Sequence, residues 1–175
     1  MIEEIPSSTS SDDSYIAFVR RSWQRNLTTA RLLTGDPHRA EELLQDCLVK
    51  LYQRWRRVSR FDDPQAYLYR MLVNGNLSRW RRGSRELLVA ESPERAAPQT
   101  QPHLPDEALR TALLTLSPRQ RAVVVLRHYA DLSEKETAAA LKCSVGAVKA
   151  HQHRALARLR DLLSETHMNL ERVIR

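Results

Sequence analysis

The stretch SEKETAAALKCSVGAVKAHQHRALARLRDLL, residues 133–163, has the pattern of two helices joined by a very short turn. Ser133 begins a Ser-x-x-Glu capping box, and Ser144 is the expected N-cap of the second helix. At about 100° per residue, the second helix has an apolar face formed by Val148, Ala155, Leu156 and Leu159. The opposite side carries Lys149, Ala150, His153 and Arg154. This spacing fits a helix-turn-helix that presents its second helix to a DNA major groove, with a plain helical bundle as the alternative.

The helix-turn-helix belongs to a longer helical block, residues 107–165, which is followed by a tail at 166–175. Apolar residues recur at helical spacing from Ala108 to Leu116. Ser117-Pro118 with Gln120 then forms another capping box, and the helix it opens is expected to run to Tyr129.

Residues 14–82 predict three more amphipathic helices that can close a small core. Gly35 is expected to end the first, and Asp36-Pro37 and Asp63-Pro64 each supply an N-cap followed by a proline at the first helical position. Asn74-Gly75 lies inside the third pattern, where the flanking periodicity predicts that the helix continues and a helix end is the alternative. Residues 1–13 are expected to be a disordered tail.

The helical periodicity fails between the two blocks, at residues 83–106. The segment from Glu91 to Glu107 has four prolines and no apolar stripe, so residues 83–106 are expected to be a flexible linker. Fully extended, this linker would reach about 80 Å. The sequence therefore predicts an all-α chain with two small helical domains joined by a flexible linker.

The chain of 175 residues is basic, with a formal net charge of +7 and a pI of about 9.9. Two basic blocks, 14–82 and 107–175, flank an acidic strip. This balance favours polyanionic partners, although arginine can also simply solvate helical surfaces. No apolar run approaches the roughly 18–20 residues that span a bilayer, and the N-terminus lacks the pattern of a secretory signal. We therefore expect a cytoplasmic protein without membrane insertion.

No pattern in the sequence points to catalysis or to a cofactor. A nucleophile–base pairing and a Gly-rich phosphate loop are both absent. His151 and His153 would point about 160° apart on a helix, so a metal site is not expected, and Cys47 and Cys143 are expected to be reduced core thiols. Glu41, Glu42 and Asp46 form an acidic cluster that is either a solvated helix face or a docking patch for a basic partner.

Two long segments carry a resemblance to a known family. The stretches Leu32–Trp55 and Asp63–Arg82 resemble region 2 of sigma factors, and Leu113–Arg160 resembles region 4. Both occur in the right order with nothing but the linker between them. The chain is therefore similar to the extracytoplasmic-function (ECF) group of the sigma-70 family, in its small actinobacterial type.

The resemblance implies roles for particular residues. It assigns binding of core RNA polymerase to Glu41, Glu42, Gln45, Asp46 and Leu48. It assigns the minus-ten element, where a base is captured from the non-template strand, to Phe61, Asn74, Ser78 and Arg79. It assigns the major groove of the minus-thirty-five element to Arg127, Lys149, Ala150, His151, His153 and Arg154.

Some positions qualify these assignments. Tyr67, Tyr69 and Trp80 are candidates to stack on bases, but helical spacing favours a core position for Tyr67. Ser78 stands where the family often has an amide, and Ala150 where it often has a hydroxyl, which leaves the promoter preference open. Lys142 occupies an inter-helix turn position that often holds glycine, and a left-handed backbone there would cost about 1 kcal/mol.

The function implied is that of a sigma factor. Such a chain would bind the β and β′ subunits of core RNA polymerase, direct the enzyme to promoter DNA and help to open it, while catalysis belongs to the polymerase. An anti-sigma factor is a further expected partner. The alternatives are a stand-alone dimeric helix-turn-helix regulator and, with less support, a helical adaptor for acidic proteins.

Overall fold

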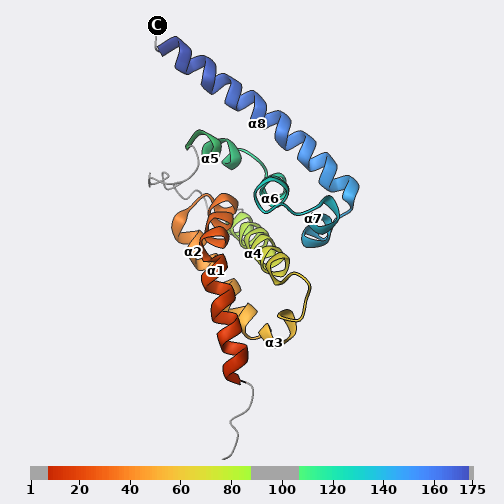
Figure 1. The fold of residues 1–175 in the computed structure, drawn as a ribbon. Helices are drawn as coiled ribbons and strands as arrows, with labels where there is room; N and C mark the ends of the chain where they lie inside the picture. Colours follow the sequence, from red (N-terminus) through yellow and green to blue (C-terminus); the bar gives the residue numbers. More distant parts are fainter. Residues whose placement is uncertain (1–7, 88–106, 174–175) are drawn as a thin grey trace, which may run out of the picture.

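The computed structural model describes residues 8–87 and 107–173, and within these ranges every regular element is a helix. The expected all-α class is therefore confirmed. The described residues form an N-terminal unit of four helices and a C-terminal unit of five, and the two units lie against one another (Figure 1). The last helix projects away from the rest of the molecule (Figure 1).

The N-terminal unit contains α1 (Ser8–Thr34), α2 (Pro37–Tyr52), the short α3 (Trp55–Val58) and α4 (Pro64–Leu87). Gly35 ends α1 with a φ of 74°, a backbone conformation that glycine adopts without a steric penalty. The Asp36 carboxylate accepts a hydrogen bond from the backbone N–H of Arg39, 2.8 Å away, and so caps α2 as predicted. Asp63 caps α4 in the same way, through the N–H of Ala66.

Helix α1 begins at Ser8, inside the segment expected to be a disordered tail. Contacts with α2 and α3 explain this difference. The Tyr52 hydroxyl donates to the carboxylate of Asp12 over 3.1 Å, and the indole N–H of Trp55 donates to the hydroxyl of Ser14 over 2.8 Å. These partners lie about 40 residues away along the chain, so the polar composition of residues 8–13 could not reveal them.

Helix α4 passes through Asn74-Gly75 without a break, as the flanking periodicity predicted, and continues to Leu87, beyond the expected domain end at residue 82. A glycine fits this position because α2 packs closely on it. A Cβ added to Gly75 would lie 2.8 Å from Cδ1 of Leu43, which is too short for an ordinary contact.

The C-terminal unit contains α5 (Glu107–Leu114), α6 (Pro118–Val124), a π-helical turn η1 (Val125–Tyr129), α7 (Glu134–Leu141) and α8 (Val145–Val173). Both predicted capping boxes are present, at Ser117 with Gln120 and at Ser133 with Glu136. Helix α8 extends through most of the segment expected to be a tail at 166–175. No glycine or proline follows Gly146 in the sequence to end it.

The two units share one continuous hydrophobic core among the described residues. Arg121 of α6 is central to the junction, because its guanidinium donates to the carbonyl of Leu33 in α1 over 2.9 Å and to three carbonyls of its own unit. Burial lowers the pKa of Arg121, and the four carbonyls compensate for part of the lost hydration. The segment expected to be a linker lies outside the described residues from 88 to 106.

Candidate polymerase and nucleic-acid interfaces

Helices α7 and α8 form the predicted helix-turn-helix. The turn between them is held by Lys142, which adopts the left-handed conformation with a φ of 52°. Val148 at the start of α8 is fully buried, and Ala138, Ala155 and Leu159 are buried around it. This packing fixes the angle of α8 and directs its opposite face away from the core.

The outward face of α8 carries exposed basic side chains. Lys149, His153 and Arg154 are all exposed, and the Lys149 ammonium lies 3.6 Å from the carboxylate of Glu134. An ion pair between side chains this exposed contributes little to stability. These three predicted residues are therefore placed together, in the position from which a recognition helix contacts DNA.

Other residues of the predicted minus-thirty-five set are less accessible. Ala150 and His151 are half-buried, and burial is the main cause that lowers the pKa of His151, with Arg119 and Arg154 acting in the same direction. The guanidinium of Arg127 donates to the carbonyl of Leu132, in the loop before α7. This hydrogen bond ties Arg127 to the loop that leads into α7, so Arg127 contacts the helix-turn-helix inside the protein.

The predicted minus-ten residue Asn74 is engaged by the C-terminal unit. Its side-chain amide donates to the carbonyl of Arg70 in α4 over 2.8 Å and to the carbonyl of Ala140 in α7 over 3.1 Å. Ala140 is in the last turn of α7, where carbonyls have no later N–H in the helix to bond. Asn74 therefore donates a hydrogen bond to a carbonyl of α7 that has no partner within its own helix.

Aromatic side chains lie in the loop before α4 and along the helix itself. Phe61 is 39% exposed and meets the half-buried Tyr67 ring edge-on, with centroids 5.7 Å apart. Trp80 is 54% exposed, whereas Tyr69 is 1% exposed and is excluded as a stacking platform in this conformation. Tyr67 packs partly against the core, and Arg54 donates to its hydroxyl over 3.4 Å.

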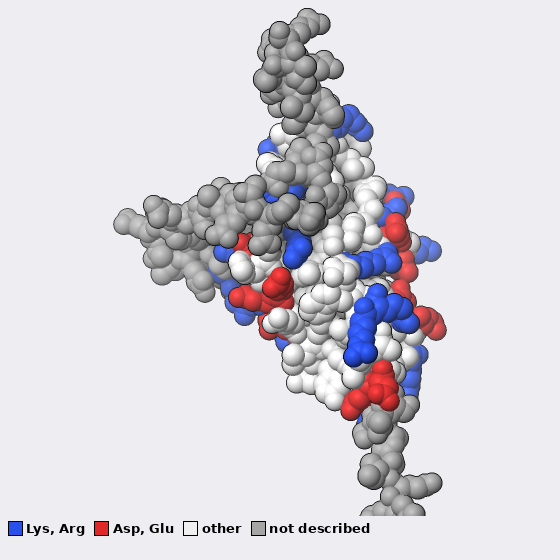
Figure 2. Space-filling model, turned by 60° about the vertical axis from the view of Figure 1, so that its left-hand side comes forward, with Lys and Arg blue, Asp and Glu red and all other residues white. Residues whose placement is uncertain are grey.

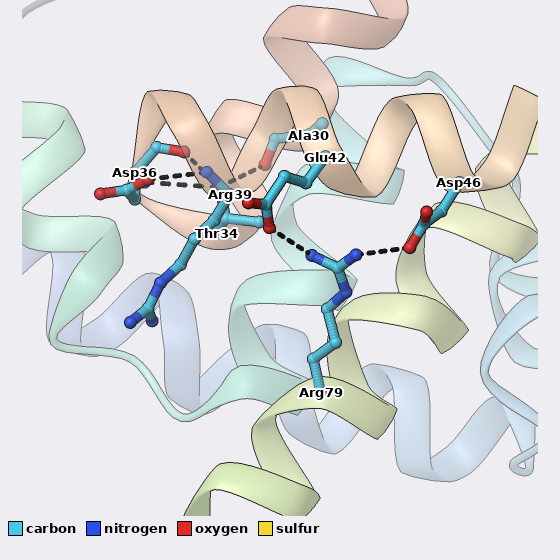
Figure 3. Close-up of polar contacts among 7 residues, drawn as sticks. All are labelled: Ala30, Thr34, Asp36, Arg39, Glu42, Asp46 and Arg79. Carbon is cyan, nitrogen blue, oxygen red and sulfur yellow. Dashed lines mark hydrogen bonds and ion pairs between the residues drawn. The ribbon is translucent and has the colours of Figure 1, made fainter.

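The acidic cluster of α2 and a basic residue of α4 are paired with each other (Figure 3). The Arg79 guanidinium lies 3.3 Å from the carboxylate of Glu42 and 2.5 Å from that of Asp46. The family resemblance assigned Arg79 to the DNA-binding set and the two acids to the polymerase-binding set. Spacing along one helix cannot reveal such a pair, because its members come from two helices.

The remaining polymerase-binding candidates differ in accessibility. Gln45 is exposed, and Glu41 is exposed with Arg31 at 3.6 Å. Leu48 is 9% exposed and belongs to the core, so its contact surface is small, whereas the adjacent Val49 is 60% exposed. Val49 was not predicted, although its place one residue outside the apolar stripe of α2 was a usable signal.

A groove with a volume of about 750 Å³ runs between the units. From the N-terminal unit it is lined by Tyr67, Met71 and Asn74 together with Ser78, Trp80 and the arginines at 70 and 81; from the C-terminal unit by Ser117, Pro118, Arg119, Leu141, Lys142 and His151. Its wall is apolar in part, and the charged residues among the described residues that line it are all basic. The groove brings residues of the predicted minus-ten and minus-thirty-five sets together, which the sequence did not predict.

On the face shown in Figure 2, basic and acidic side chains lie in adjacent clusters over the described residues. Within residues 8–87 and 107–173, no group of three His, Cys, Asp or Glu side chains is arranged to hold a metal ion. No helix in those ranges combines the length and the apolar character needed to cross a bilayer. Cys47 and Cys143 are both free thiols, and burial is the main cause that raises the pKa of Cys47 to about 11.

Both units match the models of known protein families. Residues 18–86 match the family model of Sigma-70 region 2, and residues 106–159 match that of Sigma-70, region 4. The first match lies within the N-terminal unit, and the second covers the C-terminal unit up to Leu159 in α8.

Curated relatives match over most of their length. The chain is 40% identical over 154 residues to an RNA polymerase sigma-E factor of Streptomyces avermitilis, covering 87% of this chain and 86% of that one. It is 41% identical over 148 residues to the RNA polymerase sigma-E factor of Streptomyces coelicolor, covering 83% and 84% of the two chains.

Solved structures show the same architecture. The sigma factor RpoE of Bartonella quintana, in complex with the anti-sigma factor NepR, matches with a TM-score of 0.71 at 26% identity, covering 85% of this chain and 97% of that one. CnrH in complex with the cytosolic domain of CnrY matches with a TM-score of 0.61 at 25% identity, covering 88% and 90%.

Proposed function

Because this chain belongs to the sigma-70 family, in the ECF group of RNA polymerase sigma factors, we propose that its two units divide promoter recognition between them. The chain is a sigma factor and directs transcription initiation. These matches do not favour a stand-alone dimeric regulator or an adaptor for acidic proteins. The residues that carry each step are our proposal.

Core RNA polymerase docks on the exposed side of α2. Glu41, Glu42, Gln45 and Asp46 present carboxylates and an amide to solvent, and Val49 adds exposed apolar surface beside them. A basic surface of the polymerase would compete with Arg79 for Glu42 and Asp46. Because these ion pairs are largely exposed, their exchange has a small cost.

The minus-ten element is read along α4 and the loop before it. Phe61 and Trp80 have exposed rings on which an unstacked base could lie, and Asn74 carries an amide suited to the edge of a base. In this proposal Ser78 contacts the sugar–phosphate backbone nearby, and Arg79 does so once it is released from Glu42 and Asp46. Such contacts position the strand, while the base edge gives the sequence preference.

The minus-thirty-five element is read by α8, and this step has the clearest structural support. The observation that carries it is the exposed row of Lys149, His153 and Arg154 on the side of α8 opposite the buried Val148. Arginine and lysine can bond the acceptor edge of guanine in the major groove or neutralise a phosphate. Arg127 acts by orienting this helix through the carbonyl of Leu132.

An anti-sigma factor is a further proposed partner. One matched solved structure is of a sigma factor in complex with an anti-sigma factor, and the groove between the units suits a segment with apolar and acidic side chains. Its apolar lining includes Met71 and Leu141, and its charged lining residues, Arg70, Arg81, Arg119 and Lys142, are all basic. The chain would act in the cytoplasm, with catalysis supplied by the polymerase.

Run-off transcription tests this function. Purified core RNA polymerase is incubated with genomic DNA fragments, with and without the full chain, and the transcripts are mapped. We expect discrete start sites that depend on the chain and share two upstream sequence elements. Transcripts that are the same with and without the chain would contradict the proposal.

A further inference from the structure

Side chains near the start of α1 bond to the junction between α2 and α3. The Asp12 carboxylate accepts a hydrogen bond from the hydroxyl of Tyr52, the last residue of α2, over 3.1 Å. The hydroxyl of Ser14 accepts one from the indole N–H of Trp55, the first residue of α3, over 2.8 Å. Asp12 and Ser14 precede residue 18, where the match to Sigma-70 region 2 begins. The contacts therefore use a part of this chain that the family match does not include.

The Ser14 hydroxyl is oriented by a second hydrogen bond. It donates to the carbonyl of Ser11 over 2.8 Å, which leaves an oxygen lone pair for the indole N–H of Trp55. Trp55 is 4% exposed, and the rings of Tyr15 and Phe18 lie 5.4 Å and 5.0 Å from its ring, measured between centroids. Loss of the Ser14 hydroxyl would leave the indole N–H without its partner in this packed environment, which is costly.

Helix α3 links the position of Trp55 to the loop before α4. Four residues are too few for a stable helix on their own, so α3 depends on the buried side chains of Trp55 and Val58. The backbone N–H of Ser59 donates to the carbonyl of Trp55 over 2.8 Å, and that of Phe61 donates to the carbonyl of Val58 over 3.0 Å. A displacement of Trp55 would therefore also displace Phe61.

Phe61 has a second link to α3, through α4. Its ring meets that of Tyr67 edge-on, with centroids 5.7 Å apart. Arg54, the residue before α3, donates to the Tyr67 hydroxyl over 3.4 Å. The orientation of α3 thus affects Phe61 both along the backbone and through Tyr67. A ring that is held in place before binding offers a base a better stacking surface, because less freedom is lost when the base binds.

We propose that Ser14 is a positioning residue for minus-ten recognition, and that it acts through Trp55 and α3 on the ring of Phe61. Ser14 itself does not touch DNA. The bond between Asp12 and Tyr52 supports the same junction from the end of α2. This inference rests on the proposed function for the role of Phe61 as a stacking surface, while the link from Ser14 to Phe61 rests on the contacts.

The position of Phe61 is tested by fluorine NMR on the full chain labelled with para-fluorophenylalanine. The sequence has two phenylalanines, Phe18 and Phe61, so two signals are expected, and Phe61→Leu assigns them. Ser14→Ala should shift or broaden the Phe61 signal. Ser14→Thr keeps the hydroxyl at an exposed position and should restore the signal.

Ser22→Ala is the matched control for the NMR measurement. The Ser22 hydroxyl is also on α1, but it donates to the carbonyl of Phe18 within that helix. It should therefore leave the Phe61 signal unchanged. A Phe61 signal that is the same in wild type, Ser14→Ala and Ser22→Ala would overturn the positioning.

The consequence for DNA is tested by run-off transcription with core polymerase saturated by each chain. The promoters carry every single-base change in the minus-ten element. Ser14→Ala should reduce the preference for the favoured base at one minus-ten position by up to about tenfold, a ratio that corresponds to the net free energy of about one hydrogen bond. Base preferences in the minus-thirty-five element should not change. A chain that was merely less stable would lose activity by the same factor on every promoter.

The two measurements separate the inference from the function on which it rests. A changed Phe61 signal with unchanged minus-ten preferences would overturn the role of Ser14 in recognition. A changed signal with a weaker preference at one minus-ten position, both restored by Ser14→Thr, supports it. If the wild-type chain gives no start sites of its own, the proposed function fails, and the NMR result still decides whether Ser14 positions Phe61.

Discussion

The two surfaces that this sigma factor would present to promoter DNA are in different states. On α8, Lys149, His153 and Arg154 are exposed, and Lys149 has only a solvent-exposed ion pair with Glu134. On α4, Asn74 bonds a helix of the other unit, and Arg79 pairs with two acids of α2. One surface is accessible as it stands, and the other must first lose contacts within the protein.

The difference follows from how each helix is packed. Helix α8 contacts the rest of its unit along one side and projects beyond it (Figure 1), so its opposite side meets solvent. Helix α4 lies between α2 and α7 and has neighbours on two sides. A polar residue on α4 therefore finds a protein partner where the same residue on α8 would find water.

The largest expected effect comes from a substitution that unfolds the C-terminal unit and so removes the α8 surface. Leu159 of α8 is 6% exposed, and Leu159→Asp would place an unpaired carboxylate in the core, at an expected cost of more than about 3 kcal/mol. Urea unfolding followed by circular dichroism measures the loss. Arg158→Asp, at the adjacent exposed position, is the control and should stay within about 0.5 kcal/mol.

Leu159→Asp also tests which promoter element each unit recognises. Transcription should lose its dependence on the upstream element and keep its dependence on the minus-ten element. A Leu159→Asp chain as stable as wild type would show that α8 does not pack as described.

Arg154→Ala tests whether the α8 surface reads bases. If the guanidinium bonds a base edge, binding should weaken by about 1–3 kcal/mol, mainly at one base pair. If it neutralises a phosphate, the loss should be uniform and the salt slope should fall by about one unit. Transcription from promoters that carry every single-base change in the upstream element distinguishes these results, and identical base preferences with wild type would refute base reading.

Lys142→Gly tests the backbone strain where the two units meet, because Lys142 lies two residues after Ala140. Lys142 has a φ of 52°, so glycine should relieve strain and stabilise the chain by up to about 1 kcal/mol. Ala139→Gly, inside α7, should destabilise it by about as much, because glycine has a low helix propensity. Thermal unfolding of both variants measures the two effects, and a loss of stability in Lys142→Gly would contradict the strain.

The smallest expected effect is that of Arg79→Gln on α4. Removing the ion pairs with Glu42 and Asp46 should lower stability by about 0.5 kcal/mol, since both acids are largely exposed. The loss should shrink further at high salt. Arg82→Gln, another exposed arginine of α4, is the comparison, and a larger loss there would show that the Arg79 pairs carry no stability.

Sequence signals identified most helix boundaries because those signals act locally. A capping residue bonds an N–H three positions away, as Asp36, Ser117 and Ser133 do. An apolar stripe marks the buried side of a helix, and so the burial of Val148 and the exposure of Arg154 followed from spacing alone. The π-helical turn η1 had no such signal.

The amino-acid sequence by itself determined the all-α class, the helix-turn-helix and the face of α8 that points outward, because each depends on residues a few positions apart. Only the tertiary structure decided that Asn74 bonds Ala140, that Arg79 pairs with the acids of α2, and that Arg121 caps α1. The partners in these contacts are 33 to 88 residues apart along the chain. Such contacts form only when packing brings separate helices together, and no periodicity within one helix encodes which helix becomes its neighbour.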